Sequence, residues 1–310
     1  MVRDAANRIR PLARKTPVMT CRSLDDRAGS RVFLKCENLQ RGGAFKIRGA
    51  SNLVLSIPRG DLKRGVVAFS SGNHAQATAI AAKHVGALAT IVMPADAPRS
   101  KMYPTRALGA RIVTYDRFHD NREDIAAKVL AQTGGTLVPP FDHPLIIAGQ
   151  GTAALELLEE VPDLDALVVC VGGGGLIAGS ATIAKSIRPD IRIFGVEPEL
   201  ANDTYQSFVK GEPVTIPPPD TIADGLRSPS PGKLTFPVIQ KNIERMLLVT
   251  EDEIRAAMRL MLERTKILVE PSGAVAAAAV LFGKLPAGIE RVGAIVSGGN
   301  VDGEFLKTLW

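Results

Sequence analysis

The sequence predicts an α/β fold in which parallel sheets are covered by helices on both faces. Three observations lead to this prediction: short β-branched runs, longer segments with apolar residues at helical spacing, and regular alternation of the two along the chain. The chain has 310 residues, which is enough for about two domains of ordinary size.

Seven short apolar runs are predicted to form strands. They are Val66–Phe69, Thr90–Met93, Arg111–Tyr115, Ala166–Val171, Arg192–Val196, Arg245–Val249 and Arg291–Val296. Helical spacing predicts helices over Asn73–His84, Arg122–Gln132, Ile146–Glu159, Leu176–Ser186 and 251–265. Thr250 and Glu253 form a capping box before the last of these. Ligands of open parallel sheets bind beyond the carboxyl ends of strands, so we expect functional residues directly after the strands.

Composition and charge exclude several classes of protein. Hydrophobic residues make up 45% and charged residues 23%, as in ordinary globular proteins, so a disordered chain is excluded. Aromatic residues are only 5%, which argues against a nucleic-acid surface of stacked rings. The net charge of +6 arises at one end, because residues 1–50 hold 12 Lys and Arg against 4 Asp and Glu. A basic end can meet an anionic ligand, lie near nucleic acid or be a solvated surface, but no motif of a nucleic-acid-binding protein is recognised, so we expect no nucleic-acid partner.

The cysteines and the apolar segments indicate a reduced, cytoplasmic protein. Cys21, Cys36 and Cys170 have no metal-binding spacing, and their odd number is not a disulfide framework. Residues 166–184 are uncharged over a membrane-spanning length, but the glycines Gly172–Gly175 and Gly179 favour a strand, a turn and a helix. We expect neither a signal peptide nor a membrane partner.

A glycine cluster follows the predicted strand that ends at Val171. Gly172–Gly175 can bring backbone N–H groups close to an anion at a helix N-terminus, and a phosphate group is the natural ligand. Gly173, Gly175 and Ala178 also fit a dinucleotide fingerprint, with Glu197 placed 19 residues after Ala178 as the ribose-binding acid. The alternatives at this point are a tight turn, a phosphate site and a nicotinamide-dependent dehydrogenase.

Three further motifs carry groups that suit a ligand. Ser70-Ser71-Gly72-Asn73-His74 opens a helix directly after a strand and suits a carboxylate, although a simple helix cap is the alternative. Lys46, in Ala44-Phe45-Lys46-Ile47-Arg48-Gly49, can form a Schiff base if apolar surroundings remove its proton, but most lysines are only solvated. Ser297-Gly298-Gly299-Asn300 places a hydroxyl after the last strand or forms a plain turn.

Together these motifs resemble one family. Glu37-Asn38-Leu39-Gln40, Phe45-Lys46-Ile47-Arg48-Gly49, Ser71-Gly72-Asn73-His74, Gly149-Gln150-Gly151-Thr152, Gly172–Gly175 and Ser297-Gly298-Gly299-Asn300 occur in the order found in the pyridoxal-phosphate-dependent serine/threonine dehydratase and serine racemase family. The similarity runs from about Thr16 to Asn300 and displaces the nicotinamide interpretation. It implies fold type II, with two three-layer parallel-sheet domains and the cofactor in the cleft between them.

The resemblance assigns the cofactor contacts. Lys46 would hold pyridoxal 5'-phosphate through its amine and act as the catalytic base. The other cofactor-binding residues it implies are Phe45 on the ring, Asn73 at the ring hydroxyl, Gly172, Gly173, Gly174 and Gly175 at the phosphate, and Ser297 at the ring nitrogen.

The resemblance also assigns substrate and metal contacts. Ser70, Ser71, Gly72, Asn73 and His74 would bind the substrate carboxylate, and Ser71 would be a second catalytic residue that permits racemisation or the use of D-substrates. Arg122 matches a position that helps hold dicarboxylate ligands. Glu197, Ala201 and Asp203 match the divalent-cation site of the racemase branch, where oxygen ligands favour Mg²⁺ or Ca²⁺, with Mn²⁺ as an alternative.

The leading functional expectation is a dehydratase that converts L-serine-like or L-threonine-like β-hydroxy amino acids to 2-oxo acids and ammonia. The alternatives are a serine racemase with side dehydratase activity and a 3-hydroxyaspartate dehydratase. Residues 1–49 and 143–310 would form the large cofactor-binding domain, and residues 50–142 the small mobile one. The resemblance also implies a homodimer.

Overall fold

The computed structural model describes residues 1–70, 72–97, 99–116 and 119–310, and it contains two separate sheets. The six-stranded sheet has the order β1 (Val18–Met19), β2 (Arg31–Cys36), β10 (Arg291–Val296), β7 (Ala166–Cys170), β8 (Arg192–Pro198) and β9 (Arg245–Val249). The four-stranded sheet has the order β5 (Arg111–Tyr115), β4 (Ala89–Pro94), β3 (Val66–Phe69) and β6 (Thr136–Leu137). Neighbouring strands are parallel except β1, which pairs antiparallel with β2.

Helices connect and cover these strands. They are α1 (Val2–Ile9), α2 (Arg22–Ala28), α3 (Lys46–Val54), α4 (Arg59–Leu62), α5 (Asn73–His84), α6 (Arg99–Ala107), α7 (Arg122–Thr133), α8 (Pro144–Gln150), α9 (Thr152–Glu160), α10 (Gly175–Ile187), α11 (Asp203–Lys210), α12 (Thr235–Asn242), α13 (Glu251–Leu260), α14 (Pro271–Leu281) and α15 (Gly303–Leu306). The α/β class with parallel sheets that the sequence predicts is thereby confirmed.

The largest hydrophobic core lies around the six-stranded sheet. Every residue of β7 is buried, as expected for a central parallel strand with helices on both faces. Helix α14 is buried over Pro271–Val280 because nearly all of its side chains are small and apolar. No helix among the described residues is both long and apolar enough to cross a membrane.

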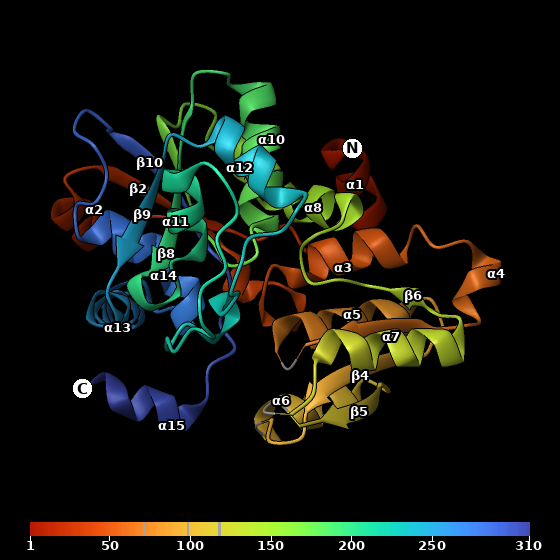
Figure 1. Cartoon of the computed structure of the whole chain (residues 1–310). Helices are drawn as coiled ribbons and strands as arrows, with labels where there is room; N and C mark the ends of the chain where they lie inside the picture. Colours follow the sequence, from red (N-terminus) through yellow and green to blue (C-terminus); the bar gives the residue numbers. More distant parts are fainter. Residues whose placement is uncertain (71, 98, 117–118) are drawn as a thin grey trace.

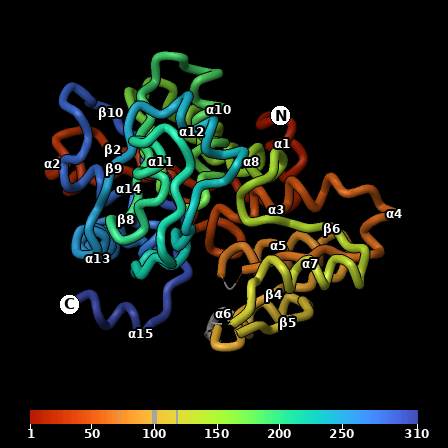
Figure 2. The backbone as a smooth tube through the Cα atoms, in the orientation of Figure 1, coloured from red at the N-terminus to blue at the C-terminus, as the bar shows by residue number. Residues whose placement is uncertain are grey.

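The chain passes twice between the two sheets, through α3 on the way out and α8 on the way back (Figures 1 and 2). These two helices pack backbone against backbone at Gly49 and Gly149. A Cβ atom on Gly149 would lie 2.5 Å from the Arg48 carbonyl oxygen, and one on Gly49 would lie 2.9 Å from the Ile146 carbonyl oxygen. Glycine at both positions therefore allows the two crossing segments to touch. The division into domains at residues 50 and 142 stays a prediction.

All seven predicted strands are confirmed, with ends that shift by at most two residues, but the sequence missed β1, β2 and β6. The predicted helix Ile146–Glu159 is wrong as a single element, because α8 and α9 meet at Gly151. A Cβ atom on Gly151 would lie 2.6 Å from the Gly179 carbonyl oxygen of α10. The break allows α10 to approach closely at this point.

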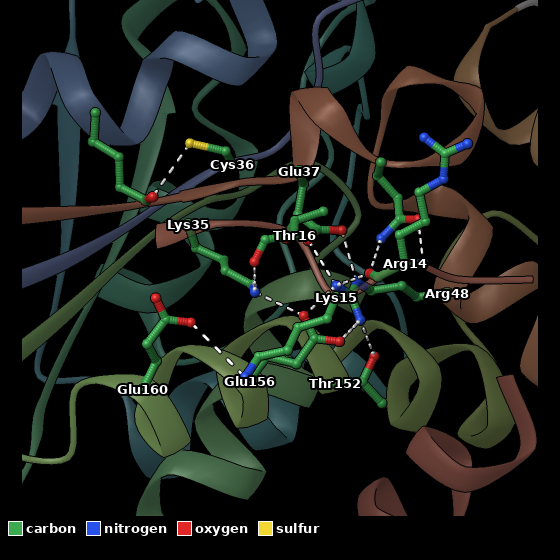
Figure 3. Close-up of polar contacts among 12 residues, drawn as sticks. Arg14, Lys15, Thr16, Lys35, Cys36, Glu37, Arg48, Thr152, Glu156 and Glu160 are labelled. Carbon is green, nitrogen blue, oxygen red and sulfur yellow. Dashed lines mark hydrogen bonds and ion pairs between the residues drawn. The ribbon is translucent and has the colours of Figure 1, made fainter. Parts of the chain in front are cut away.

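A buried cluster of ionised side chains forms around Arg48 of α3, and Figure 3 shows its contacts. The Arg48 guanidinium contacts both carboxylate oxygens of Glu37 at 2.7 and 2.8 Å and both of Glu156 at the same two distances. Lys35 donates to Glu156 at 2.7 Å and to the Thr16 carbonyl at 2.6 Å. Arg48, Glu37 and Lys35 are each 0% exposed. The cluster joins the N-terminal segment, β2, α3 and α9.

Candidate active site

A pocket lies where the carboxyl ends of strands from both sheets converge. Ser70 follows β3 of the four-stranded sheet, while Gly172 and Ser297 follow β7 and β10 of the six-stranded sheet, and all three line the pocket. This is the position at which open parallel sheets bind ligands. The sheet topology therefore brings together motifs that lie more than 200 residues apart in the sequence.

Lys46 lies in this pocket at the first position of α3. Its Nζ donates to the Pro140 carbonyl at 2.8 Å and lies 5.1 Å from the centre of the Phe45 ring. The Phe45 N–H donates to the Ser297 carbonyl at 3.0 Å, so the lysine is tied to the loop after β10. Burial lowers the pKa of Lys46 to about 8, partly opposed by Cys170 and by the Glu270 carboxylate. A lysine with this pKa has a substantial neutral, nucleophilic fraction near neutral pH.

The glycine loop between β7 and α10 forms a cradle for an anion. Gly174 has a φ of +87°, and a Cβ atom on Gly173 would lie 2.3 Å from the Phe141 ring. The N–H groups of Gly172, Gly173 and Gly174 have no hydrogen-bond acceptor within the part of the chain that the structure describes. These N–H groups and the N-terminus of α10 fit a phosphate group.

The loop before α5 brings polar groups to the opposite side of the pocket. Ser70, Gly72, Asn73 and His74 line it, whereas Ser71 lies outside the described residues. The His74 Nε2 lies 2.8 Å from the Val138 carbonyl, so Nε2 carries the proton and Nδ1 is an acceptor. Burial and the nearby Lys46 lower the pKa of His74 to about 3, so its ring is neutral. An anionic ligand here would meet backbone N–H groups rather than a charged imidazole.

Arg122 also reaches the pocket, although it comes from the start of α7. Its guanidinium lies over the Phe69 ring at 5.5 Å from the ring centre. This stacking orients the guanidinium while leaving its N–H groups able to bind a carboxylate. Arg122 therefore adds a cationic group to the pocket besides Lys46, and Arg227 lines the pocket as well.

The sequence reasoning assigned no role to several residues that line the pocket, among them Glu270, Cys170 and Gln150, although Gln150 belongs to one of the quoted motifs. Glu270, at the N-terminal cap of α14, accepts a hydrogen bond from Asn73 Nδ2 at 2.7 Å. Gln150 has an unpartnered, buried Oε1 among the described residues, and Cys170 ends β7 beside Ser297. Glu270 directly precedes Pro271 at a helix start, and a carboxylate at such a position is a signal that could have marked it.

Glu197, Ala201 and Asp203 do not line the pocket but lie together where β8 meets α11. Glu197 accepts N–H groups of Thr204 and Tyr205 at 3.2 and 2.7 Å. Burial and the neighbouring Asp203 raise the pKa of Glu197, and burial raises the pKa of Asp203 to about 7. The Asp203 Oδ1 is buried with no partner among the described residues. Two buried carboxylates with an unsatisfied oxygen, next to the Ala201 backbone, fit a divalent cation.

Comparisons with known proteins agree on one family. Residues 9–298 match the family described as pyridoxal-phosphate dependent enzyme. The chain is 49% identical to the L-threo-3-hydroxyaspartate ammonia-lyase of Saccharomyces cerevisiae, with 99% of this chain and 94% of the relative covered. It is 46% identical to the serine racemase of Schizosaccharomyces pombe, with 97% and 93% covered. The structure of maize serine racemase superposes with a TM-score of 0.96 at 44% identity, covering 99% of this chain and 94% of that one.

Proposed function

The chain belongs to the pyridoxal-phosphate dependent enzyme family, with the fold type II architecture, and from this premise we propose that it is an ammonia-lyase that converts small β-hydroxy amino acids to 2-oxo acids and ammonia. Its cofactor is pyridoxal 5'-phosphate. The observation that carries the proposal is that one pocket contains both Lys46, with its pKa lowered to about 8, and the Gly172–Gly175 loop.

The pocket residues match the separate parts of this cofactor. The N–H groups of Gly172–Gly175 would hold the phosphate, and the Lys46 amine would hold the ring aldehyde carbon. Asn73 would contact the ring oxygen and Ser297 the ring nitrogen, while the Phe45 ring would pack on the cofactor ring. Ser297 is 2% exposed, and its neutral hydroxyl would polarise the ring nitrogen less strongly than a carboxylate.

The chemistry divides between cofactor and protein. When bound, the cofactor supplies an electron sink for the charge that develops at the substrate Cα atom. The Lys46 amine removes the Cα proton, a role that suits a base with a pKa close to the working pH. Backbone N–H groups at the start of α5, beside Gly72 and Asn73, bind the substrate carboxylate and fix its orientation.

Arg122 favours 3-hydroxyaspartate among the candidate substrates. A second substrate carboxylate would pair with its guanidinium, which faces the pocket from the Phe69 ring. A relative at 49% identity is named for ammonia elimination from L-threo-3-hydroxyaspartate, which supports the same choice. L-Serine and L-threonine share the remaining groups and stay as weaker substrates.

Racemisation is the second candidate activity, because a relative at 46% identity is a serine racemase. Ser71, which the resemblance gives the second catalytic role, lies outside the described residues. Its assignment stays a prediction, as do the homodimer and the cytoplasmic location.

We also propose that a divalent cation binds at Glu197, Ala201 and Asp203. Carboxylate and carbonyl oxygens suit Mg²⁺ or Ca²⁺, with Mn²⁺ as a further candidate. The site lies outside the pocket, so the cation would stabilise the six-stranded sheet region rather than take part in the reaction.

Product analysis tests the proposed function. The purified protein, with pyridoxal phosphate and Mg²⁺, is incubated separately with L-threo-3-hydroxyaspartate, L-serine and L-threonine. Oxo acid, ammonia and D-serine are quantified. We expect equal amounts of oxo acid and ammonia, fastest with hydroxyaspartate. D-Serine in excess over pyruvate would instead make racemisation the main activity, and no product from any substrate would reject the ammonia-lyase.

A further inference from the structure

We propose that Asn300 and Glu270 are positioning residues that hold the Asn73 amide in a single orientation, with an N–H group rather than its carbonyl facing the ring oxygen of the cofactor. This inference rests on the proposed function, which gives Asn73 the contact with that oxygen. It adds two residues to which neither the sequence motifs nor the comparisons assign a role.

The direction of the hydrogen-bond chain is fixed at one end by a backbone carbonyl. Asn300 Nδ2 donates to the Gly42 carbonyl at 2.8 Å, and a carbonyl can only accept. The same Nδ2 donates to Asn73 Oδ1 at 2.8 Å. The Asn73 carbonyl is therefore directed toward Asn300, and its amino group is directed away from it.

The other end of the chain gives the same direction. Asn73 Nδ2 donates to Glu270 Oε1 at 2.7 Å, and an ionised carboxylate only accepts hydrogen bonds. An amide nitrogen carries two N–H groups, so one remains for a ligand in the pocket that Asn73 lines. Turning the amide over would place its oxygen against the Glu270 carboxylate, which the repulsion between two acceptors opposes.

A glycine turn just before the lysine makes room for Asn300. Gly42 and Gly43 have φ values of +75° and +73°, and a Cβ atom on Gly43 would lie 2.2 Å from Asn300 Oδ1. The Gly299 N–H donates to the Gly43 carbonyl at 2.9 Å, which holds the two loops together. The turn that leads into Lys46 therefore also anchors the chain of hydrogen bonds.

The orientation of Asn73 has a chemical consequence. An N–H group facing the ring oxygen stabilises its ionised form, whereas a carbonyl oxygen in the same place stabilises its protonated form. The ionised and protonated forms of the bound cofactor absorb at different wavelengths, so the absorption spectrum reports the orientation directly, without turnover.

Asn300→Asp tests the orientation. Its carboxylate cannot donate to Gly42 or to Asn73, and it would accept from Asn73 Nδ2, which turns the amide over. At neutral pH we expect the absorption of the bound cofactor to shift from the visible toward the near ultraviolet. Cofactor binding should weaken about tenfold, the loss typical of one good hydrogen bond. Asn242→Asp is the matched control, because Asn242 Nδ2 also donates to a backbone carbonyl, at 2.8 Å, but does not line the pocket.

A double variant separates positioning from a purely structural role. In Asn300→Asp with Glu270→Gln, the new carboxylate accepts from Asn73 and the new amide donates to it, so the two bonds to Asn73 are restored in the reverse direction, while the Gly42 carbonyl stays without its donor. We expect the double variant to be thermally more stable than Asn300→Asp alone while its absorption stays shifted. Recovery of both stability and spectrum would overturn the proposal and leave only a structural role.

The remaining outcomes are distinct from a failure of the proposed function. A wild-type spectrum in Asn300→Asp, together with a shifted one in Asn73→Ala, would overturn the roles of Asn300 and Glu270 while the cofactor contact stands. An unchanged spectrum in Asn73→Ala would also overturn the inference, although product formation could continue. If the wild-type protein bound no pyridoxal phosphate, the proposed function would fail and the inference with it.

Discussion

Helix α3 contributes to two polar regions that differ in how completely their groups are paired. In the buried ion cluster, the Arg48 guanidinium binds Glu37 and Glu156 with all of its donor atoms (Figure 3). In the pocket, Lys46 lies among groups that include buried acceptors on His74 and Gln150 without partners among the described residues. The two regions begin only two residues apart, at Lys46 and Arg48.

The difference shows which polar groups maintain the fold and which are kept for a ligand. Burial opposes the charge of Arg48, but the ion pairs with Glu37 and Glu156 outweigh it and raise the pKa of Arg48 further. Burial lowers the pKa of Lys46 to about 8, because the neighbouring Cys170 and Glu270 compensate for the burial only in part. A closed cluster keeps its ions charged, whereas an open pocket leaves one amine ready to react.

The largest expected effect comes from removing the Lys46 amine from the pocket. Lys46→Ala should reduce turnover by at least about a thousandfold, because both the nucleophile and the base are lost. Borohydride treatment of the loaded protein, followed by mass spectrometry, should show a cofactor adduct in the wild type and none in the variant. An adduct that persists in Lys46→Ala would assign the attachment to another lysine.

Breaking the buried ion cluster around Arg48 should lower the stability of the fold instead. Arg48→Met leaves the Glu37 carboxylate buried without its guanidinium and should lower the free energy of unfolding by roughly 3–5 kcal/mol. The double variant Arg48→Met with Glu37→Met removes both charges and should recover part of this loss. Urea unfolding of the cofactor-free proteins measures both. Equal stability of Arg48→Met and the wild type would contradict the role given to the cluster.

Within the pocket, Arg122 should affect substrate choice more than catalysis. Arg122→Gln should lower kcat/KM for L-threo-3-hydroxyaspartate about ten- to a hundredfold, because a charge-assisted contact to the second carboxylate is lost. The value for L-serine, which has no second carboxylate, should change little. An equal loss with both substrates would place Arg122 outside substrate recognition.

The lowered pKa of Lys46 predicts how cofactor loading depends on pH. The neutral amine is the nucleophile, and its fraction rises as the pH passes upward through about 8. The rate of loading of the cofactor-free protein should therefore increase about tenfold between pH 7 and pH 9 and then level off. Stopped-flow absorption measures this rate. A midpoint near the ordinary lysine value would show that Lys46 is not perturbed as the pocket indicates.

The smallest effect is expected at the buried carboxylates of Glu197 and Asp203, where the Asp203 Oδ1 has no partner among the described residues. Mg²⁺ should raise the melting temperature of the wild-type protein by a few degrees, because it binds only the folded state. Asp203→Asn, which keeps the shape but loses the charge beside Glu197, should remove this response. A matched rise in the variant would locate the cation elsewhere.

Much of the fold was predictable because strands made of continuous β-branched runs can be recognised from the sequence alone. Strand β2 was not, since Arg31 and Lys35 give it a charged composition, and the burial of the Lys35 charge is explained only by its tertiary contacts with Glu156 and the Thr16 carbonyl. The break between α8 and α9 depends on the close approach of Gly151 to Gly179, which no local pattern contains.

The site shows the same division. Lys46, Asn73, Gly172–Gly175 and Ser297 were marked by motifs, and they line one pocket in the structure, although their cofactor contacts remain proposals. Glu270 was not marked, because its importance arises from a hydrogen bond to Asn73 across 197 positions of sequence. Partnerships over such distances depend on tertiary structure rather than on local residue order.

The sharing of the pocket between two sheets has an evolutionary consequence. The glycine loop and Ser297 follow strands of the six-stranded sheet, whereas Ser70 and Arg122 come from segments of the four-stranded sheet. Under the proposed function, mutations confined to the segments of the four-stranded sheet would change which amino acid is accepted, while the glycine loop of the six-stranded sheet would keep its contacts with the cofactor phosphate. With this arrangement, new substrate preferences could arise by mutation while the cofactor chemistry stays the same.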